Sequence, residues 1–244
     1  MDDLRIQIVN YKTKSYLSEC LRSVSADLNG NELKYSVGIL DNASGDDISD
    51  IPRLFPDICV EIVVNDKNNG FGAGHNLLAK KGEARYLLLL NPDIKIIEAK
   101  TIERMVGRAN NAPAQIVGPR LVAPDGRTQR WDHGELKGLY AHSAPLGGKS
   151  YWKEQFKPLS VAWVSGAVFL IEKFCFDRLG GFDEKFFLYK EEEDLCLQLR
   201  QQGGVTIYDP TISVFHHGSV VAKKSEHMKE SSLYFREKHL NRKN

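Results

Sequence analysis

The chain has 244 residues, of which 42% are hydrophobic and 27% charged, with a formal net charge of +1. This length allows one large or two small domains, and the near-neutral charge argues against a protein that coats nucleic acid. No apolar run approaches the roughly 20 residues that span a bilayer, and the acidic start MDDLRIQ is unlike a signal peptide. The scattered Cys20, Cys59, Cys175 and Cys196 indicate reduced core thiols of a cytosolic protein.

The first half of the chain alternates strand and helix patterns. Apolar runs predict four strands, at residues 4–9, 35–40, 60–64 and 86–90. Apolar residues at helical spacing predict helices over 17–28, around 48–55, over 76–81 and over 101–109. This alternation indicates βαβ units and a mostly parallel sheet. The fourth strand is nearly all leucine, as expected for a strand that is buried on both faces.

The pattern changes after residue 112. Two short strands are predicted at 115–118 and 121–122, followed by a Pro-Asp-Gly turn at 124–126 and a long loop over 132–158. A strand over 161–171, interrupted at Ser165-Gly166, precedes a helix that ends near residue 203. The remaining expected elements are strands at 205–208 and 212–215 and a charged helix over 225–240.

Polar residues follow three of the first-half strands. Asn10 follows the first strand, Asp41-Asn42 the second and Asn91-Pro92-Asp93 the fourth. In open α/β sheets, ligands bind outside the carboxyl ends of the strands. Any one of these positions is more simply explained as a turn or helix cap. Three together, with a glycine-rich loop between them, favour a shared nucleotide site.

That loop is Asn68–Asn76, which contains G-x-G-x-G before a helix. Glycines there let backbone amides approach a diphosphate, although glycine also serves ordinary tight turns. A dinucleotide-binding fingerprint would follow the first strand, where Lys12–Ser15 contains no glycine. The position of the loop therefore counts against a dehydrogenase. Asp93 is a candidate ligand for Mg²⁺ or Mn²⁺, because such ions take one or two carboxylates besides phosphates and waters.

An acidic run, Glu191–Asp194, opens an amphipathic helix in the second half. Carboxylates in a first helical turn stabilise the helix dipole by roughly 0.3–1 kcal/mol, which is the simplest explanation of the run. The alternative is that one carboxylate is a general base for an acceptor hydroxyl. Glu191 and Asp194 lie about 60° apart around a helix and Glu192 projects roughly opposite Asp194, so all four acids cannot share one role. His216-His217 closes a strand and is weak on its own as a metal site.

Together these segments resemble the family 2 glycosyltransferases of the GT-A fold, and most of all the bacterial rhamnosyltransferase type. They follow the family's order and cover nearly the whole chain. The matching stretches are IVNY (8–11), LDNAS (40–44), NNGFGAGHN (68–76), LLLLNPD (87–93), VSGAVFLI (164–171), GGFDEKFFLYKEEEDLCLQLR (180–200) and HHGS (216–219).

The resemblance implies a Rossmann-like α/β fold with helices on both faces of a mostly parallel sheet and a smaller mixed subregion on the acceptor side. We expect one domain, with a nucleotide-sugar-binding half over 1–112, an acceptor-binding and catalytic half over 113–222 and a charged C-terminal helix over 223–244. The residues that it implies for donor-nucleotide binding are Asn10, Asp41 (which would read a pyrimidine), Asn42, Gly70, Gly72, Asn76, Asn91 and Asp93.

The other implied roles fall mainly in the second half. Gly166 and Ala167 would lie beside the acceptor, and we place Asp194 with them. Asp93 and His216 would bind the divalent metal, with Asn91 in place of the first acid of the family's D-x-D motif. The family's catalytic motif is Glu-Asp-x-Asp, and its base position is held here by Glu192.

Glu192 is therefore a departure with a physical consequence. One extra methylene moves a carboxylate by more than an ångström, and such a misplacement can cost about a hundredfold in rate. Either the backbone retreats to compensate, or Glu191 takes the role, or the protein is slow or inactive. We favour compensation, with Glu192 as the base, because the surrounding motifs are intact.

The resulting prediction is an inverting hexosyltransferase that acts in bacterial surface polysaccharide synthesis. The resemblance favours L-rhamnose from dTDP-rhamnose as the sugar and a glycan or lipid-linked saccharide as the acceptor, with no nucleic-acid partner. The alternatives are a glycosyltransferase-like protein that binds nucleotide sugar or glycan without turnover, and a nucleotide-dependent oxidoreductase. We expect a cytoplasmic location. Basic residues from 223 onward would allow peripheral contact with the inner face of the cell membrane, but interleaved glutamates favour a solvated helix face.

Overall fold

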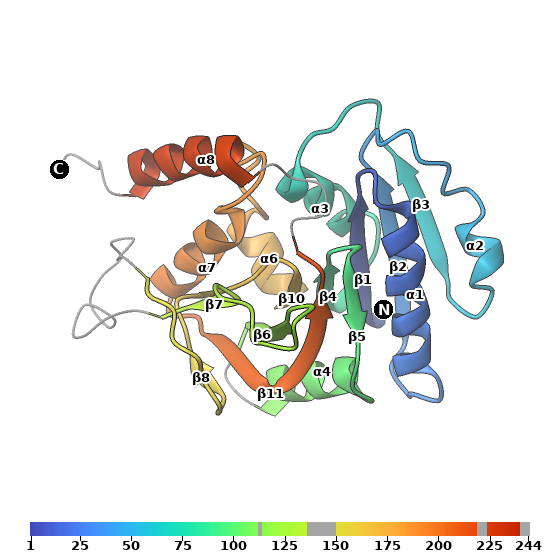
Figure 1. Ribbon diagram of the computed structural model, residues 1–244, viewed down its shortest axis with the longest axis horizontal. Coiled ribbons are helices and arrows are strands. Elements are labelled where there is room, and N and C mark those ends of the chain that lie inside the picture. The colour runs from blue at the N-terminus through green and yellow to red at the C-terminus, as the bar shows by residue number, and fades with distance from the viewer. Residues whose placement is uncertain (112–113, 136–149, 219–223, 240–244) are drawn as a thin grey trace.

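The computed structural model describes residues 1–111, 114–135, 150–218 and 224–239 (Figure 1). One sheet runs through this described part of the chain, and a two-stranded sheet accompanies it. The strands are β1 (Asp2–Asn10), β2 (Tyr35–Asp41), β3 (Val60–Val64), β4 (Ala84–Leu90), β5 (Ile94–Ile96), β6 (Ile116–Val122), β7 (His133–Gly134), β8 (Leu159–Ser160), β9 (Trp163–Val164), β10 (Val168–Glu172) and β11 (Thr206–His216).

The main sheet has the order β3-β2-β1-β4-β10-β6-β11-β5, with β8 paired to β11. The first four strands in this order are parallel, as the strand and helix alternation predicts. Asn10 pairs in register with Asp41, and Ile8 with Leu90, so the carboxyl ends of β1, β2 and β4 meet at one edge. Strand β10 is antiparallel to both of its neighbours, which gives the second half its mixed character.

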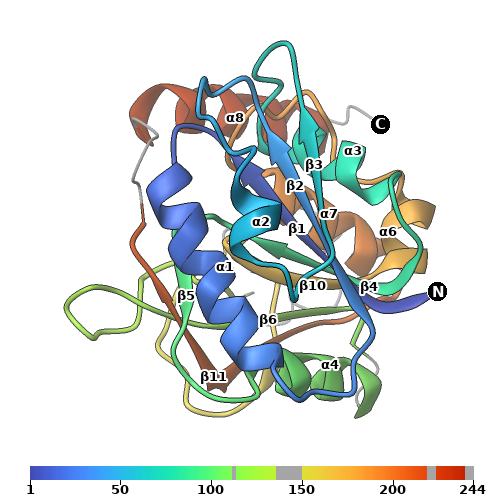
Figure 2. The same ribbon diagram turned by 90° about the vertical axis from the view of Figure 1, so that its right-hand side faces the viewer.

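Helices cover both faces of the sheet. In Figure 2, α1 and α2 lie in front of the sheet while α6 and α7 lie behind it. The helices are α1 (Lys14–Leu28), α2 (Ile51–Leu54), α3 (Phe71–Ala79), α4 (Thr101–Asn111), α6 (Lys173–Leu179), α7 (Glu191–Gln201) and α8 (Lys224–His239).

Strand β4 lies between two hydrophobic cores, one on each face of the sheet. Leu88 and Leu90 pack in the core that contains the buried residues of α1 and α4. Leu87 and Leu89 pack in the opposite core, with the apolar residues of α6 and α7. Because side chains alternate across a strand, both faces must be apolar, which explains the leucine run.

The structure differs from the predicted elements at several places. Residues 206–216 form one strand with a register shift between Asp209 and Ser213, where two separate strands were predicted. Residues 116–122 likewise form one strand in place of the two that were predicted. Helix α3 begins at Phe71, five residues before the predicted start. The short elements β5 and α6 had no clear periodic signal and were not predicted. All four cysteines are free, but Cys59 is exposed and is not a core thiol. Among the described residues, no helix has the length and apolar character needed to cross a bilayer.

Candidate active site

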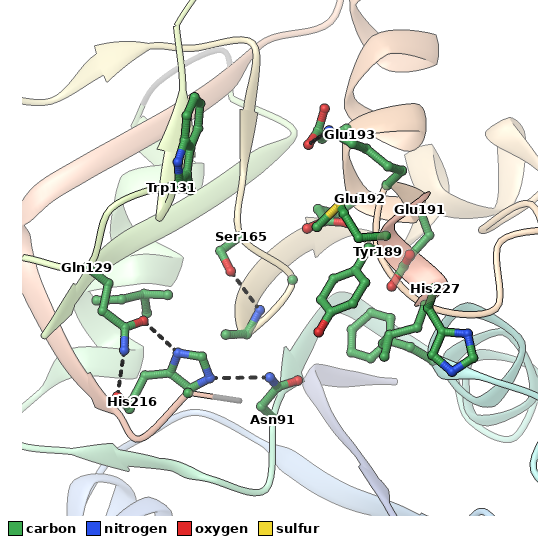
Figure 3. A pocket seen from close by; sticks show the side chains of 18 of the residues that line it. Asn91, Gln129, Trp131, Ser165, Tyr189, Glu191, Glu192, Glu193, His216 and His227 are labelled. Atoms are coloured by element: carbon green, nitrogen blue, oxygen red, sulfur yellow. Dashed lines mark hydrogen bonds and ion pairs between the residues drawn. The ribbon is translucent and has the colours of Figure 1, made fainter. Parts of the chain in front are cut away.

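A cavity of about 1720 Å³ opens at the carboxyl edge of the sheet. Asp93 and Glu192, which come from opposite halves of the chain, both line it. Figure 3 shows Asn91, His216 and Gln129 at one corner, with Tyr189 and the acids of α7 facing them. The start of α7, the loop at 165–167 and residues of α8 complete the wall.

The first corner of the cavity holds Asp93 and His216. Nδ1 of His216 lies 2.8 Å from Oε1 of Gln129, and Nε2 of Gln129 donates to the His216 carbonyl at 2.8 Å. This pairing orients Gln129 and puts the imidazole proton on Nδ1. The lone pair of Nε2 then faces Oδ1 of Asp93 at 3.4 Å and Nδ2 of Asn91 at 3.4 Å.

This corner fits a divalent cation. Two acceptors, the Asp93 oxygen and the imidazole nitrogen, face each other, and a hydrogen bond at Nδ1 is the usual support of a metal-binding histidine. Burial raises the pKa of Asp93, but the neighbouring His216 and the hydrogen bond from the amide of Gly218 outweigh it and hold the pKa below its usual value. The described residues contain no group of three or more such ligands. Phosphate and water would supply the rest, as Mg²⁺ and Mn²⁺ commonly require.

The second corner is the start of α7. Tyr189 and Lys190, just before the helix, have φ of 72° and 76°, a left-handed conformation that costs free energy for residues other than glycine. The carbonyl of Phe187 accepts a hydrogen bond from the amide of Phe71 at 3.0 Å. A Cβ on Gly70 would lie 2.2 Å from that oxygen, so only glycine allows this approach. The glycine-rich loop therefore fixes the segment from which the acids project.

The acids of α7 are poorly compensated. Within the described part of the chain, Oε2 of Glu191 and Oε2 of Glu192 have no hydrogen-bond partner. Burial, followed by the charge of Glu193, raises the pKa of Glu192 to about 7. Burial and then the charge of Glu192 raise the pKa of Glu191 well above its usual value. Glu193 is ion-paired with Lys190 at 2.6 Å, so Glu192 is the acid that can exchange a proton near neutral pH.

Asp194 lies away from the cavity, and its placement beside the acceptor is not supported by the structure. Its side chain is fully buried and faces α8, where His239 and Lys238 contact its carboxylate, the latter at 2.9 Å. Helical geometry is the reason, because Glu192 and Asp194 project to nearly opposite sides of α7. Lys238 also binds Asp183 at 2.7 Å, which takes this lysine out of the basic residues considered for membrane contact. The other basic residues Lys223, Arg242 and Lys243 fall outside the described residues.

The strand-end residues of β1 and β2 form a buried network. Nδ2 of Asn10 donates to Asp41 at 2.8 Å, and Ser44 binds the same carboxylate through its hydroxyl and its amide. Neither Asn10 nor Asp41 lines the cavity, whereas Asn42 does. Asn42 donates to the carbonyl of Gly70 at 3.0 Å and so ties β2 to the glycine-rich loop. The predicted contacts of Asn10 and Asp41 with a nucleotide stay predictions.

The remaining predicted residues support the cavity wall. Asn76 binds both the amide and the carbonyl of Phe182, at 2.9 Å each, and does not line the cavity. A Cβ on Gly72 would lie 2.9 Å from Phe182, so this glycine is needed for close packing. Gly166 and Ala167 line the cavity, and a Cβ on Gly166 would lie 3.9 Å from Cβ of Glu192.

Several residues of the cavity escaped sequence analysis. Gln129 and Trp131 follow the predicted turn at 124–126, in a stretch without a periodic pattern. His227 and Phe235 reach the cavity from α8, more than 100 residues from Asp93 in sequence. The only available signal for α8 was its helical character, which does not say where a helix docks.

A parallel half that ends in polar residues, joined to a mixed half with buried acids, is the architecture of the GT-A glycosyltransferases, and solved structures confirm the fold. GalNAc-T7, solved with UDP, GalNAc and Mn²⁺, matches with a TM-score of 0.69 at 16% identity over 89% of this chain. The chain spans only 44% of that protein. A mannosyltransferase of Pyrobaculum calidifontis, in complex with GDP-Man and Mn²⁺, matches with a TM-score of 0.64 at 15% identity, over 98% of this chain and 62% of its own.

The chain belongs to glycosyl transferase family 2, whose model matches residues 6–175, and it is a glycosyltransferase. A Mycobacterium tuberculosis protein named N-acetylglucosaminyl-diphospho-decaprenol L-rhamnosyltransferase is 28% identical over 240 residues, covering 88% of this chain and 76% of its own length. The rhamnosyltransferase WbbL of Escherichia coli K12 is 26% identical over 228 residues, covering 87% of this chain and 82% of WbbL. The oxidoreductase alternative is thereby excluded.

Proposed function

We propose that the protein is an inverting glycosyltransferase in which Glu192 is the general base and the Asp93 corner receives the diphosphate of the sugar donor. The observation that carries this proposal is that Glu192 and the Asp93–His216 pair line the same cavity. Glu192 has an oxygen without a hydrogen-bond partner in the described ranges, and burial raises its pKa to about 7, the range in which a carboxylate base is most effective.

The reaction is a single displacement. Glu192 takes the proton of an acceptor hydroxyl, and the oxygen attacks the anomeric carbon while the bond from that carbon to the diphosphate oxygen breaks. Attack from the side opposite the leaving group inverts the anomeric configuration. Glu191 is only 3% exposed, and burial and the charge of Glu192 raise its pKa well above the usual value, so it is the weaker candidate for the base.

Asp93 and His216 would hold a divalent metal ion, which when bound stabilises the charge that develops on the departing diphosphate. Asn91 lies against the same imidazole at 3.4 Å and can donate a hydrogen bond to a phosphate oxygen. The structures of GalNAc-T7 and of the Pyrobaculum mannosyltransferase were both solved with Mn²⁺, which supports a metal in this fold.

The donor sugar that we propose is L-rhamnose from dTDP-rhamnose, and the acceptor is a glycan on a lipid diphosphate carrier. The names of the mycobacterial and Escherichia coli relatives support rhamnosyl transfer, and the mycobacterial name supports a lipid-linked acceptor. Such a reaction would extend a bacterial surface polysaccharide.

A donor screen by calorimetry tests the proposal. The protein is titrated with dTDP, UDP, GDP and NAD, each with and without MnCl₂, and dTDP-rhamnose turnover is then measured. We expect dTDP to bind tightest, with affinity that depends on Mn²⁺, and Asp93→Asn to remove that dependence. Glu192→Gln should keep dTDP binding and lose turnover.

Two results would overturn the proposal. Metal-independent binding of NAD in preference to the nucleoside diphosphates would contradict the donor site. Tight dTDP binding by the wild-type protein, without hydrolysis or transfer for any acceptor tested, would favour a nucleotide-sugar-binding protein that lacks turnover.

A further inference from the structure

Trp131 is an aromatic side chain that stands exposed in the wall of the cavity. It is 51% exposed, although the cavity that it lines is the one that holds the acids and the metal corner. Its ring stacks on that of Trp163, with centroids 6.4 Å apart and an interplanar angle of 11°. Trp131 keeps half of its side chain exposed in the cavity wall beside this contact.

The backbone holds Trp131 in this position. Its φ of 68° is a left-handed conformation, which persists for a bulky residue only where the neighbouring structure imposes it. The next residue, Asp132, supplies that support because its buried carboxylate accepts hydrogen bonds from Tyr208 at 2.7 Å and from Trp152 at 3.0 Å. Its carbonyl also accepts the amide of Ser165 at 2.9 Å. The hydrogen bonds of Asp132 thus hold the backbone at Trp131 in a defined conformation.

Trp163, the other ring of the pair, is fixed as well. It is 6% exposed, and its Nε1 donates to Oγ of Ser150 at 3.1 Å. A Cβ on Gly134 would lie 2.2 Å from the same nitrogen, so glycine at this position makes room for the indole. The pair is therefore a rigid, preorganised surface, which reduces the entropy lost when a ligand packs on it.

The position of Trp131 assigns it to one substrate. In Figure 3 it stands across the cavity from Glu192 and Glu193, with Ser165 between them, and away from the corner of Asn91 and His216. We propose that Trp131 is a stacking platform for a pyranose ring of the acceptor, and that it holds the ring so that one of its hydroxyls reaches Glu192. This inference rests on the proposed function, because it takes Glu192 as the base.

The surroundings of Trp131 favour a sugar over the other ligands of such an enzyme. A pyranose combines a face of C–H groups, which packs on an aromatic ring, with a rim of hydroxyls that needs polar partners. Arg130, the residue before Trp131, is exposed and lines the same cavity, as does Ser165, and these polar side chains would be unsuitable for a lipid chain. A nucleobase could also stack there, and the experiment below treats it as an opposing outcome.

Saturation-transfer NMR with simple glycosides tests the platform. The probes are the methyl glycosides of N-acetylglucosamine, galactose, mannose and rhamnose, each with dTDP and MnCl₂ present. For at least one glycoside, we expect the C–H protons of one ring face to be saturated most strongly. Trp131→Ala should weaken its binding about three- to tenfold, and Trp131→Phe by less, because an aromatic contact contributes about 0.5–1.5 kcal/mol.

The matched control is Phe156→Ala, which removes an aromatic side chain that is 75% exposed and does not line the cavity. It should leave glycoside binding unchanged, and the affinity for dTDP should be unchanged in all three variants. The unfolding midpoint of each variant shows whether a loss reflects misfolding, and Trp131→Phe keeps the test open if Trp131→Ala is unstable.

The platform is overturned if no glycoside binds to the wild-type protein, or if Trp131→Ala binds the glycoside as the wild type does. It is also overturned if Trp131→Ala weakens dTDP as much as the glycoside, because the ring would then serve the nucleobase. By contrast, a protein that fails to bind dTDP but shows glycoside binding dependent on Trp131 would contradict the proposed donor and support the platform.

Discussion

The carboxylates at the strand ends and those at the start of α7 lie around one site but differ in their hydrogen-bond partners. Asp41 accepts hydrogen bonds from Asn10 and Ser44, and Asp93 accepts from Gly218 and contacts His216. On α7, one oxygen of Glu191 and one of Glu192 have no hydrogen-bond partner among the residues that the structure describes. The first region is a satisfied hydrogen-bond network, whereas the second keeps acids buried without compensation.

This difference separates positioning from proton transfer. A buried polar group without a partner costs roughly 1–3 kcal/mol, so nothing in folding favours the α7 arrangement. Asp194 offsets part of this cost, because its ion pair and hydrogen bonds with Lys238 and His239 attach α7 to α8. We infer that the strand-end network holds the residues of the proposed donor site in place. Burial of Glu192 lowers the stability of the fold and raises the pKa of this side chain.

The largest expected effect comes from Glu192→Gln. Removing the base should lower kcat about 10²- to 10⁴-fold, while dTDP affinity is retained. The pKa of Glu192 rises from 4.5 to about 7 on folding, so its contribution to stability is full below pH 4.5 and is lost as the pH rises through 7. At pH 8 the neutral amide should therefore raise the free energy of unfolding, by roughly 1–3 kcal/mol. Urea unfolding at pH 5 and pH 8, alongside transfer assays, checks both parts.

Glu192→Asp restores the residue that the family pattern has at this position. If the site has adapted to the longer side chain, the shorter one will hold its carboxylate more than an ångström from the acceptor hydroxyl. We then expect kcat to fall about a hundredfold with little change in the KM for the donor. Steady-state kinetics of the two proteins measures this, and an aspartate variant as fast as the wild type would show that the backbone had not compensated.

Asp41→Asn tests the strand-end region, in which the carboxylates have hydrogen-bond partners. An amide group would face the donors of Asn10 and Ser44, so at least one hydrogen bond to a charged acceptor would be lost. We expect the free energy of unfolding to fall by about 1.5–3 kcal/mol at neutral pH, the opposite sign to Glu192→Gln. Asp66→Asn is the matched control, since Asp66 is exposed, and its urea midpoint should stay at the wild-type value.

The same contrast explains what the sequence could predict. In the parallel half, each strand is an apolar run that ends in a polar residue, so a local pattern predicts both the strand and the site edge. The acidic run was equally visible, but helical geometry alone left open which acid faces the cavity. The neighbours of Asp194 are Lys238 and His239, 44 and 45 residues further along the chain, and no local rule specifies such a pairing.

Other parts of the site depend on similar long-range contacts. Asn76 lies in a motif predicted to shape the donor pocket, but its partner is Phe182, which is 106 residues away. The support of His216 by Gln129 spans 87 residues. The resemblance to the family predicted that Asp93 and His216 lie at one site. Family motifs can predict such a contact because they reflect tertiary structure, whereas hydrophobic periodicity reflects only local structure.

The smallest expected effect is a shift in the pH dependence, and it concerns Glu193. Burial raises the pKa of Glu192 first, and the charge of Glu193 raises it further. With wild-type protein, kcat/KM should fall as the pH drops through about 7, because the base becomes protonated. Glu193→Gln removes the neighbouring charge and frees Lys190 from its ion pair, and both changes lower the pKa of Glu192.

The acid limb of the pH profile should therefore move to lower pH in Glu193→Gln, with the plateau rate kept. Glu237→Gln on the exposed side of α8 is the matched control and should leave the limb in place. An unmoved limb in Glu193→Gln would mean that the group that titrates in catalysis is not on α7. The proton acceptor would then be one of the hydrogen-bonded groups at the strand ends. In that case the strand ends would transfer the proton, and α7 would only position the substrate.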